Sequence, residues 1–88
     1  MLLDNIHLQL KQLITDASAI KLLDESHKHR HHRQHIPGKH HIKIIIHSTT
    51  MANLPMLKAH RLIYNAINEE QWAMIHAVAI EITPSTSL

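Results

Sequence analysis

The sequence predicts a small α/β (α+β) domain with the element order helix, strand, strand, helix, strand and a three-stranded mixed sheet. Residues before position 18 and after Pro55 repeat apolar side chains every three or four positions, which is the spacing of amphipathic helices. Between them, an isoleucine-rich run alternates as a β-strand does. The length of 88 residues predicts one domain, 1–88, with a thin core.

The first helix and the first strand are predicted from apolar spacing near the N-terminus. The helical stripe contains Leu3, Ile6, Leu10, Leu13, Ile14 and Ala17. Residues 19–24 then alternate, with Ile20 and Leu22 on one face, which predicts a short strand.

A histidine-rich loop is expected over residues 25–39, because this segment has no apolar periodicity and ends in the turn pair Pro37-Gly38. Seven of the 11 histidines lie between His27 and His41. The stretch from Ser26 to Asn68 contains seven Lys and Arg and no acidic residue. Because loops of this length in small domains are usually functional or disordered, this segment is the first candidate site.

The second half of the chain predicts strand, helix and strand. Residues 40–48 form the most convincing strand, with Ile42, Ile44 and Ile46 on one face. A polar connection follows over 48–55, in which Asn53 is expected to take a left-handed conformation in place of glycine. A helix beginning at Pro55 is expected to reach about Glu70, and a strand over 75–82 closes the domain.

Several side chains of this half are assigned to the core. The stripe of the second helix contains Met56, Ala59, Leu62, Ile63, Ala66 and Ile67. Met51, Met56 and Met74 are expected to fill gaps between the layers. His60 is expected to pack against Tyr64, one helical turn later.

The expected topology brings distant histidines together. A strand-helix-strand passage favours a right-handed crossover between parallel strands, and the first strand is then the antiparallel neighbour of the second. The end of the first strand and the starts of the other two therefore lie at one edge of the sheet. The histidines that gather there are His27, His29, His40, His41 and His76.

Composition excludes several classes of function. Without cysteine, the chain cannot form disulfides, use a thiolate nucleophile or hold an iron-sulfur cluster on its own sulfurs. With Gly38 as the only glycine, it cannot build a glycine-rich phosphate loop. The sequence has no Ser/His/Asp pattern of recognisable spacing, so we expect no enzyme. Apolar runs stay well short of the ~20 residues of a membrane span, so we expect a cytoplasmic protein.

A set of short motifs carries a resemblance to a known family. The motifs are Asp24-Glu25-Ser26 followed by His29, then Pro37-Gly38, His41-Ile42-Lys43, His60-Arg61-Leu62-Ile63-Tyr64, Glu69-Glu70 and Ile75-His76-Ala77-Val78-Ala79-Ile80. In this order and spacing the chain resembles the BolA-like family over residues 22–83, which leaves 84–88 as a tail. The resemblance implies a fold similar to the class II KH topology, with helices on one face of the sheet.

The resemblance also implies a function. BolA-like proteins pair with monothiol glutaredoxins and share a bridging [2Fe-2S] cluster, in iron-sulfur trafficking or in iron and stress regulation. The glutaredoxin brings its own cysteine and a glutathione thiolate. The ligands implied here are His76 and a loop histidine, for which His29 matches by its distance from the preceding motif, with His27 and His31 as less favoured choices.

Other interpretations remain open at this point. Without the resemblance, the residues favour His76 as a half-buried histidine bonded to a neighbouring carbonyl. The loop histidines can bind metal ions adventitiously or as a storage or sensing segment. Trp72 is either an exposed partner contact or a cap over the core. The runner-up function is DNA or RNA binding and transcription regulation through the basic middle segment. The cationic contact candidates, for nucleic acid or glutaredoxin, are Arg61, Lys58, Lys39 and Lys43. The isolated chain is expected to be a monomer or a weak dimer.

Overall fold

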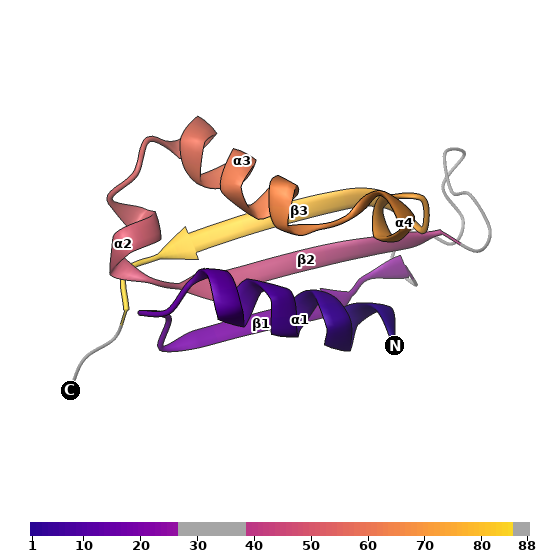
Figure 1. The fold of residues 1–88 in the computed structure, drawn as a ribbon, viewed down its shortest axis with the longest axis horizontal. Helices are drawn as coiled ribbons and strands as arrows, with labels where there is room; N and C mark the ends of the chain where they lie inside the picture. The colour runs from indigo at the N-terminus through magenta and orange to yellow at the C-terminus, as the bar shows by residue number, and fades with distance from the viewer. Residues whose placement is uncertain (27–38, 86–88) are drawn as a thin grey trace.

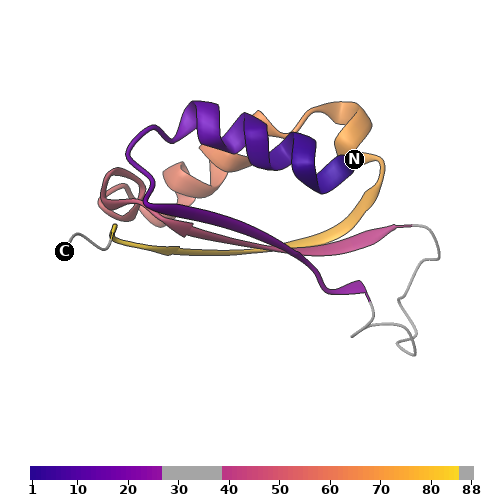
Figure 2. The ribbon, with the colours of Figure 1, turned by 90° about the horizontal axis from the view of Figure 1, so that it is seen from below.

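The computed structural model describes residues 1–26 and 39–85. Along the chain, the elements are α1 (Leu2–Leu13), β1 (Ala19–Asp24), β2 (His40–His47), α2 (Thr49–Ala52), α3 (Met56–Ala66), α4 (Glu69–Trp72) and β3 (Ile75–Thr83). Figure 1 shows the helices lying over the sheet, and Figure 2 shows that they cover one face and leave the other bare. None of the described helices is long and apolar enough to cross a membrane.

The sheet is mixed, as predicted. Its strand order is β1-β2-β3, with β1 antiparallel and β3 parallel to the central strand β2. One rung joins Leu22, Ile44 and Ile80, which are cross-strand partners in the two pairings. The crossover from β2 to β3 passes through α2, α3 and α4, so the parallel pairing arises from a strand-helix-strand connection.

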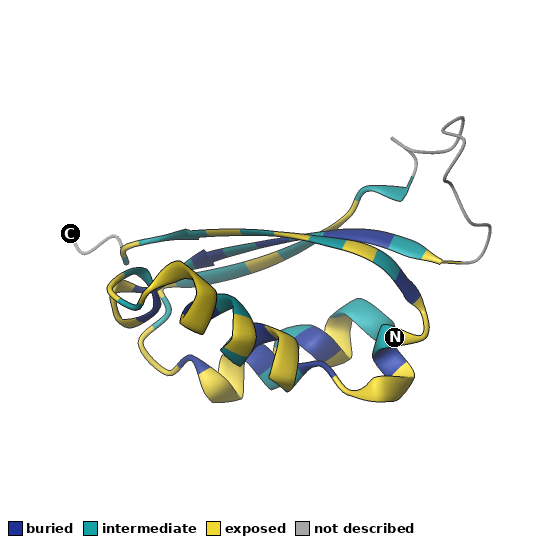
Figure 3. Ribbon diagram, turned by 90° about the horizontal axis from the view of Figure 1, so that it is seen from above, coloured by how far each residue is buried: buried dark blue, intermediate teal, exposed yellow. Residues whose placement is uncertain are grey.

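The core lies between β2 and the two long helices. Ile42, Ile44 and Ile46 are buried on the helix side of β2, as their alternation predicts. Ile6 of α1 and Ile63 of α3 are fully buried against this row. In Figure 3, dark blue marks the buried residues on both the helices and the strands. Because β2 is the central strand, its isoleucines share one core cluster with side chains from both halves of the chain.

The first helix ends at Leu13, so Ile14 and Ala17 of its predicted apolar stripe lie beyond it. Ile14 leaves helical geometry, with φ −106° and ψ 84°, yet stays buried. Its turn inward fills the core position at the end of α1, and Leu13 is left exposed to solvent. Asp4 in the first turn and Lys11 in the last turn complement the helix dipole.

The predicted polar connection over 48–55 contains a short helix, so that prediction is wrong in part. Ser48 caps α2 by accepting a hydrogen bond from the Met51 amide at 3.1 Å. The Asp16 carboxylate accepts from the Thr50 amide at 2.9 Å and from the Ser48 hydroxyl at 2.6 Å. Asn53 continues the right-handed geometry, with φ −84° and ψ −9°, and its expected left-handed conformation is wrong.

The helix expected over 55–70 is two helices. α3 ends at Ala66 because Ile67 is extended, with φ −94° and ψ 122°. Asn68 then caps α4: its side chain accepts from the Gln71 amide at 2.9 Å, and the Gln71 side chain accepts from the Asn68 amide at 3.0 Å. This reciprocal capping box stabilises the start of a new helix at Asn68, so α3 does not continue through it.

Two of the three methionine assignments are also wrong. Met51 is buried, as predicted, but Met56 is 75% exposed and Met74 is 46% exposed. Met56 opens α3, and Met74 lies in the turn before β3, so neither faces the packed interior of the two layers. The expected packing of His60 against Tyr64 is confirmed, with ring centroids 6.4 Å apart.

Replacing Ile44 by alanine tests the role of β2. Ile44 is 1% exposed, so Ile44→Ala should lower the free energy of unfolding by about 2 to 5 kcal/mol, through lost burial and a residual cavity. Its neighbour Ile45 is half-buried on the bare face, and Ile45→Ala should cost roughly 1 kcal/mol. Urea denaturation followed by circular dichroism measures both. Equal losses would contradict the assignment of the core to one face of β2.

Candidate functional site

The edge of the sheet that is formed by strand ends, and not by the side of an outer strand, brings together the end of β1 and the starts of β2 and β3. Asp24 pairs with Ile42, and His40 pairs with Ile75, so the predicted convergence is confirmed for the described residues. His27, His29 and His31 lie outside the described residues. The described chain stops at Ser26 and resumes at Lys39, and both positions belong to this edge (Figure 1).

An irregularity at the start of the β2-β3 ladder sets the position of His76. His40 pairs with Ile75, whereas His41 pairs with Ala77, so His76 is an extra residue on β3. This is a β-bulge, which commonly re-aims a side chain next to a functional site. Ile75 is buried in the core, while His76 stays half-buried.

The bulge places two imidazoles side by side. The ring centroids of His41 and His76 are 4.8 Å apart, and the ring planes are inclined by 51°. His41 is buried and lines a shallow pocket of about 260 Å³ at the start of β2 and β3. Glu25, Ala77 and Ala79 also line this pocket. His76 is thus held against a buried ring while remaining partly accessible to solvent.

The Asp24-Glu25-Ser26 motif ties the end of β1 to the start of β2. The Asp24 carboxylate accepts hydrogen bonds from the amide and the hydroxyl of Ser26. Its other oxygen accepts from His40 Nδ1 at 2.8 Å. The Ser26 hydroxyl oxygen accepts from the His41 amide at 3.2 Å, and the Glu25 amide donates to the His41 carbonyl at 2.7 Å. The motif therefore holds Ser26, the last described residue before the histidine-rich segment, against the start of β2.

These contacts favour the charged form of Asp24. The hydrogen bond from the Ser26 hydroxyl is the largest cause that lowers the pKa of Asp24, to about 2; partial desolvation opposes it, and the Ser26 amide and His40 lower the pKa by smaller amounts. The carboxylate is therefore ionised at neutral pH and can hold the His40 ring in one orientation.

Other described histidines have structural contacts. His7 Nε2 donates to the Ile20 carbonyl at 2.9 Å, and the His47 ring is hydrogen-bonded to the Thr83 hydroxyl at 2.7 Å. Across residues 1–26 and 39–85, no group of three or more His, Asp or Glu side chains is arranged to hold a metal ion. The described residues alone therefore do not form a complete metal site.

The predicted cationic contact residues do not form one patch. Lys58 and Arg61 are exposed on α3, whereas Lys43 lies on β2 and pairs with Glu81 at 3.3 Å. Lys39 is exposed at the edge that holds His40. A ligand that contacts α3 would therefore meet Lys58 and Arg61 without Lys43.

Trp72 has a structural position at the end of α4. Its indole N–H donates to the Tyr64 carbonyl at 3.2 Å, and the two rings meet edge to face with centroids 5.3 Å apart. The side chain packs against the core cluster, as expected for a cap over the core. A partner contact through its exposed part stays a prediction.

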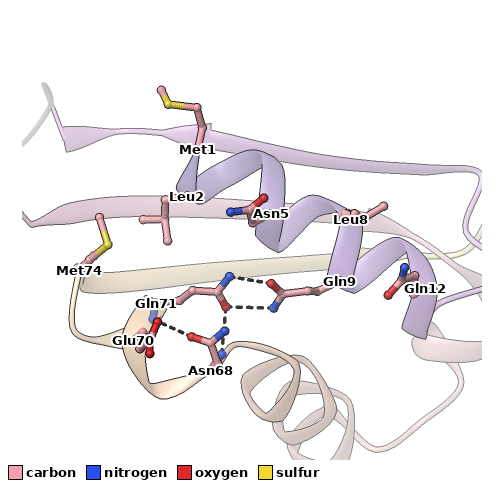
Figure 4. Close-up of a pocket in the computed structure, with 10 residues that line it drawn as sticks. All are labelled: Met1, Leu2, Asn5, Leu8, Gln9, Gln12, Asn68, Glu70, Gln71 and Met74. Atoms are coloured by element: carbon pink, nitrogen blue, oxygen red, sulfur yellow. Dashed lines mark hydrogen bonds between the residues drawn. The ribbon is translucent and has the colours of Figure 1, made fainter.

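A second hollow, between α1 and α4, was not predicted (Figure 4). It is lined by Met1, Leu2, Asn5, Leu8, Gln9, Gln12, Asn68, Glu70, Gln71 and Met74. The amides of Gln9 and Gln71 exchange hydrogen bonds of 2.9 and 2.7 Å, and Gln9 also donates to the Ala66 carbonyl. The pattern Asn68-x-x-Gln71 is the sequence signal for this cap, but its partner Gln9 lies too far away in sequence to be found.

The low pKa of Asp24 predicts a pH-dependent contribution to stability. A carboxyl whose folded pKa is depressed stabilises the protein above its unfolded pKa of 3.8, and this stabilisation disappears as pH falls from 3.8 towards 2. The difference in unfolding free energy between wild type and Asp24→Asn should therefore shrink over that range. Carbon-13 NMR titration of the carboxyl checks the cause, since Ser26→Ala should raise the pKa of Asp24. A wild-type Asp24 that titrates near 3.8 would contradict the described network.

Comparisons with known proteins agree with the fold. A family model described as BolA-like protein matches residues 10–86. The chain is similar to the BolA domain of SufE1 from Arabidopsis thaliana, with 25% identity and a TM-score of 0.71, covering 92% of this chain and 88% of that one. Comparison with curated protein sequences gives no match.

Two further solved structures share the fold. BolA1 from Arabidopsis thaliana is 21% identical with a TM-score of 0.71, over 92% of this chain and 88% of that one. The solution structure of BolA1 from Mus musculus is 24% identical with a TM-score of 0.73, over 94% of this chain and 64% of that one. With a family match that spans residues 10–86 and the same arrangement of helices and strands, the chain belongs to the BolA-like family.

Proposed function

We propose that the protein is a non-enzymatic adaptor that pairs with a monothiol glutaredoxin and shares a bridging [2Fe-2S] cluster with it. This chain supplies His76 and one histidine of the 27–38 segment, and the partner supplies its cysteine and glutathione. The observation that carries the proposal is the place of His76, on a bulge at the edge where both ends of the histidine-rich segment meet.

The chemistry of the available donors fits such a cluster. The chain has no cysteine, so its donors are imidazoles, and clusters with two histidines on one iron are known to be stable and to have raised reduction potentials. A cluster shared in this way requires two ligands from this chain. The lack of a three-ligand group among the described residues is compatible with that division of ligands.

The neighbours of His76 have defined tasks in this proposal. The buried His41 ring restricts the rotation of the His76 ring. Asp24 and Ser26 hold the start of β2 against the end of β1, which keeps the two ends of the loop close to His76. For the second ligand we retain the order His29, then His27, then His31; all three lie outside the described residues.

Substitution of His76 tests direct ligation. His76→Ala should abolish the visible absorption and circular dichroism of the cluster in a complex coexpressed with a monothiol glutaredoxin, and the domain should stay folded. His76→Cys should retain a cluster and lower its reduction potential, because a thiolate donates more charge to iron than a neutral imidazole does. Measuring His29→Ala, His27→Ala and His31→Ala in the same way ranks the loop histidines.

His47→Gln is the matched control. His47 is a half-buried histidine at the opposite end of β2, and glutamine can keep a hydrogen bond to Thr83. This variant should form a cluster with wild-type spectra. A His76→Ala complex with an unchanged spectrum, or a His76→Cys complex with an unchanged potential, would contradict ligation by His76.

Nucleic-acid binding and transcription regulation are a second candidate function, supported by exposed Lys58 and Arg61 one helical turn apart on α3. If these side chains contact phosphates, the double variant Lys58→Ala/Arg61→Ala should weaken duplex binding. The slope of log affinity against log salt concentration should then fall in magnitude by about two. Fluorescence anisotropy with two unrelated sequences measures the slope and any specificity. An unchanged slope would rule out this surface.

A further inference from the structure

The outer edge of β3 is a long strand edge that no described element covers. β3 spans nine residues, and β2 is its neighbour on one side only. Within residues 1–26 and 39–85, no strand pairs with its other side. Figure 3 shows this strand with alternating exposed and half-buried residues along the sheet. Strand edges of this kind are templates for pairing unless charges, proline or a covering segment protect them.

Beside this edge, α3 presents an apolar flank. At 100° per residue, Met56, His60, Tyr64 and Leu57 occupy one sector of about 100°, next to the buried row of the helix. Met56, Leu57 and Tyr64 are 75%, 63% and 40% exposed. The solvent side of the helix carries Lys58, Arg61 and Asn65 instead. The exposed apolar residues therefore lie between the core row and the charged face of the helix.

A groove joins the flank to the strand edge. The groove has a volume of about 210 Å³, and Met56 and His60 line it together with Ile80 and Ile82 of β3. Val78, Ile80 and Ile82 are only half-buried, although they belong to the helix side of the sheet. The strand edge and the α3 flank thus form one continuous strip, with main-chain hydrogen-bonding groups along one side and apolar side chains along the other.

Charges on β3 oppose pairing only weakly. Glu81 is the one charged residue between Ile75 and Thr83, and it forms an ion pair with Lys43 of the neighbouring strand. In an antiparallel pair of two β3 strands with Ala79 opposite Ala79, Glu81 of each copy faces Ala77 of the other. Val78 then faces Ile80 on the helix side. This register avoids like charges opposite each other and matches apolar side chains.

We propose that the strip binds a second copy of this chain, through antiparallel pairing of the two β3 strands and packing of the two α3 flanks. A two-fold axis perpendicular to the sheet reverses the strand direction and keeps both helix layers on the same side. The strip is self-complementary under that operation, because each strand meets its own sequence and each flank meets its own apolar row. The result is a continuous sheet of six strands, twice the three of one copy.

Charge reversal at position 79 tests the pairing in the isolated chain. Ala79 is exposed on the bare face, so Ala79→Lys and Ala79→Glu should both fold. Each alone places like charges next to the axis and should weaken dimerisation by at least about tenfold. An equimolar mixture of the two should restore a dimer. Sedimentation velocity over a range of protein concentrations measures all three samples and the wild type.

Leu23→Lys is the matched control, because Leu23 is an exposed residue on β1, the other edge strand. It should leave dimerisation unchanged, whereas Leu57→Lys on the α3 flank should weaken it. A wild-type chain that remains monomeric at every concentration would overturn the proposal, and so would a dimer sensitive to Leu23→Lys but not to Ala79→Lys. Since these measurements use neither iron nor glutaredoxin, their outcome is independent of the proposed cluster function.

Discussion

Burial of the β2 isoleucines between the sheet and the helices is the interaction on which the rest of the structure depends. Ile42, Ile44 and Ile46 belong to one buried cluster with residues of both long helices, so they fix which face of the sheet is covered. A shift of β2 by one residue would expose this row and bury Lys43 and Ile45 in its place. The register, and with it the edge where His41 meets His76, is therefore determined by apolar packing rather than by any contact between histidines.

That register also explains why the candidate ligand lies on a bulge. Ile75 must be buried, and Val78, Ile80 and Ile82 must face the helix layer, although an uninterrupted alternation would put residues 75 and 78 on opposite faces. The extra residue, His76, absorbs this mismatch. Packing on both sides of it thus leaves a side chain whose direction the regular ladder does not determine.

Much of this arrangement could be predicted from the sequence, because it depends on strong local patterns. The strands, the mixed sheet and the convergence at one edge follow from alternation and from the handedness of the crossover. The break between α3 and α4 was missed because the apolar stripe continues to Ile67, one residue beyond the end of α3, and Asn68 starts a new cap directly after it. The bulge was missed because it depends on the fit of β3 to β2, which no local pattern reports. The exposed Met56 was missed because periodicity predicts which side of a helix a residue lies on. It does not predict whether other residues cover that part of the helix.

The two ends of β2 show how the neighbour, rather than the residue type, decides what a histidine does. At the far end, His47 is bonded to Thr83, while Ser48 and the Ser85 hydroxyl bind Asp16, whose pKa the Ser48 hydroxyl lowers most. These polar contacts tie the ends of β2 and β3 to the loop after α1 and give that histidine a structural task. At the near end, carboxylate and hydroxyl groups bind His40 and the backbone of His41, and the bulged His76 meets a ring instead. The described contact of His76 is with a ring and uses neither imidazole nitrogen, whereas the hydrogen bond with Thr83 uses Nδ1 of His47.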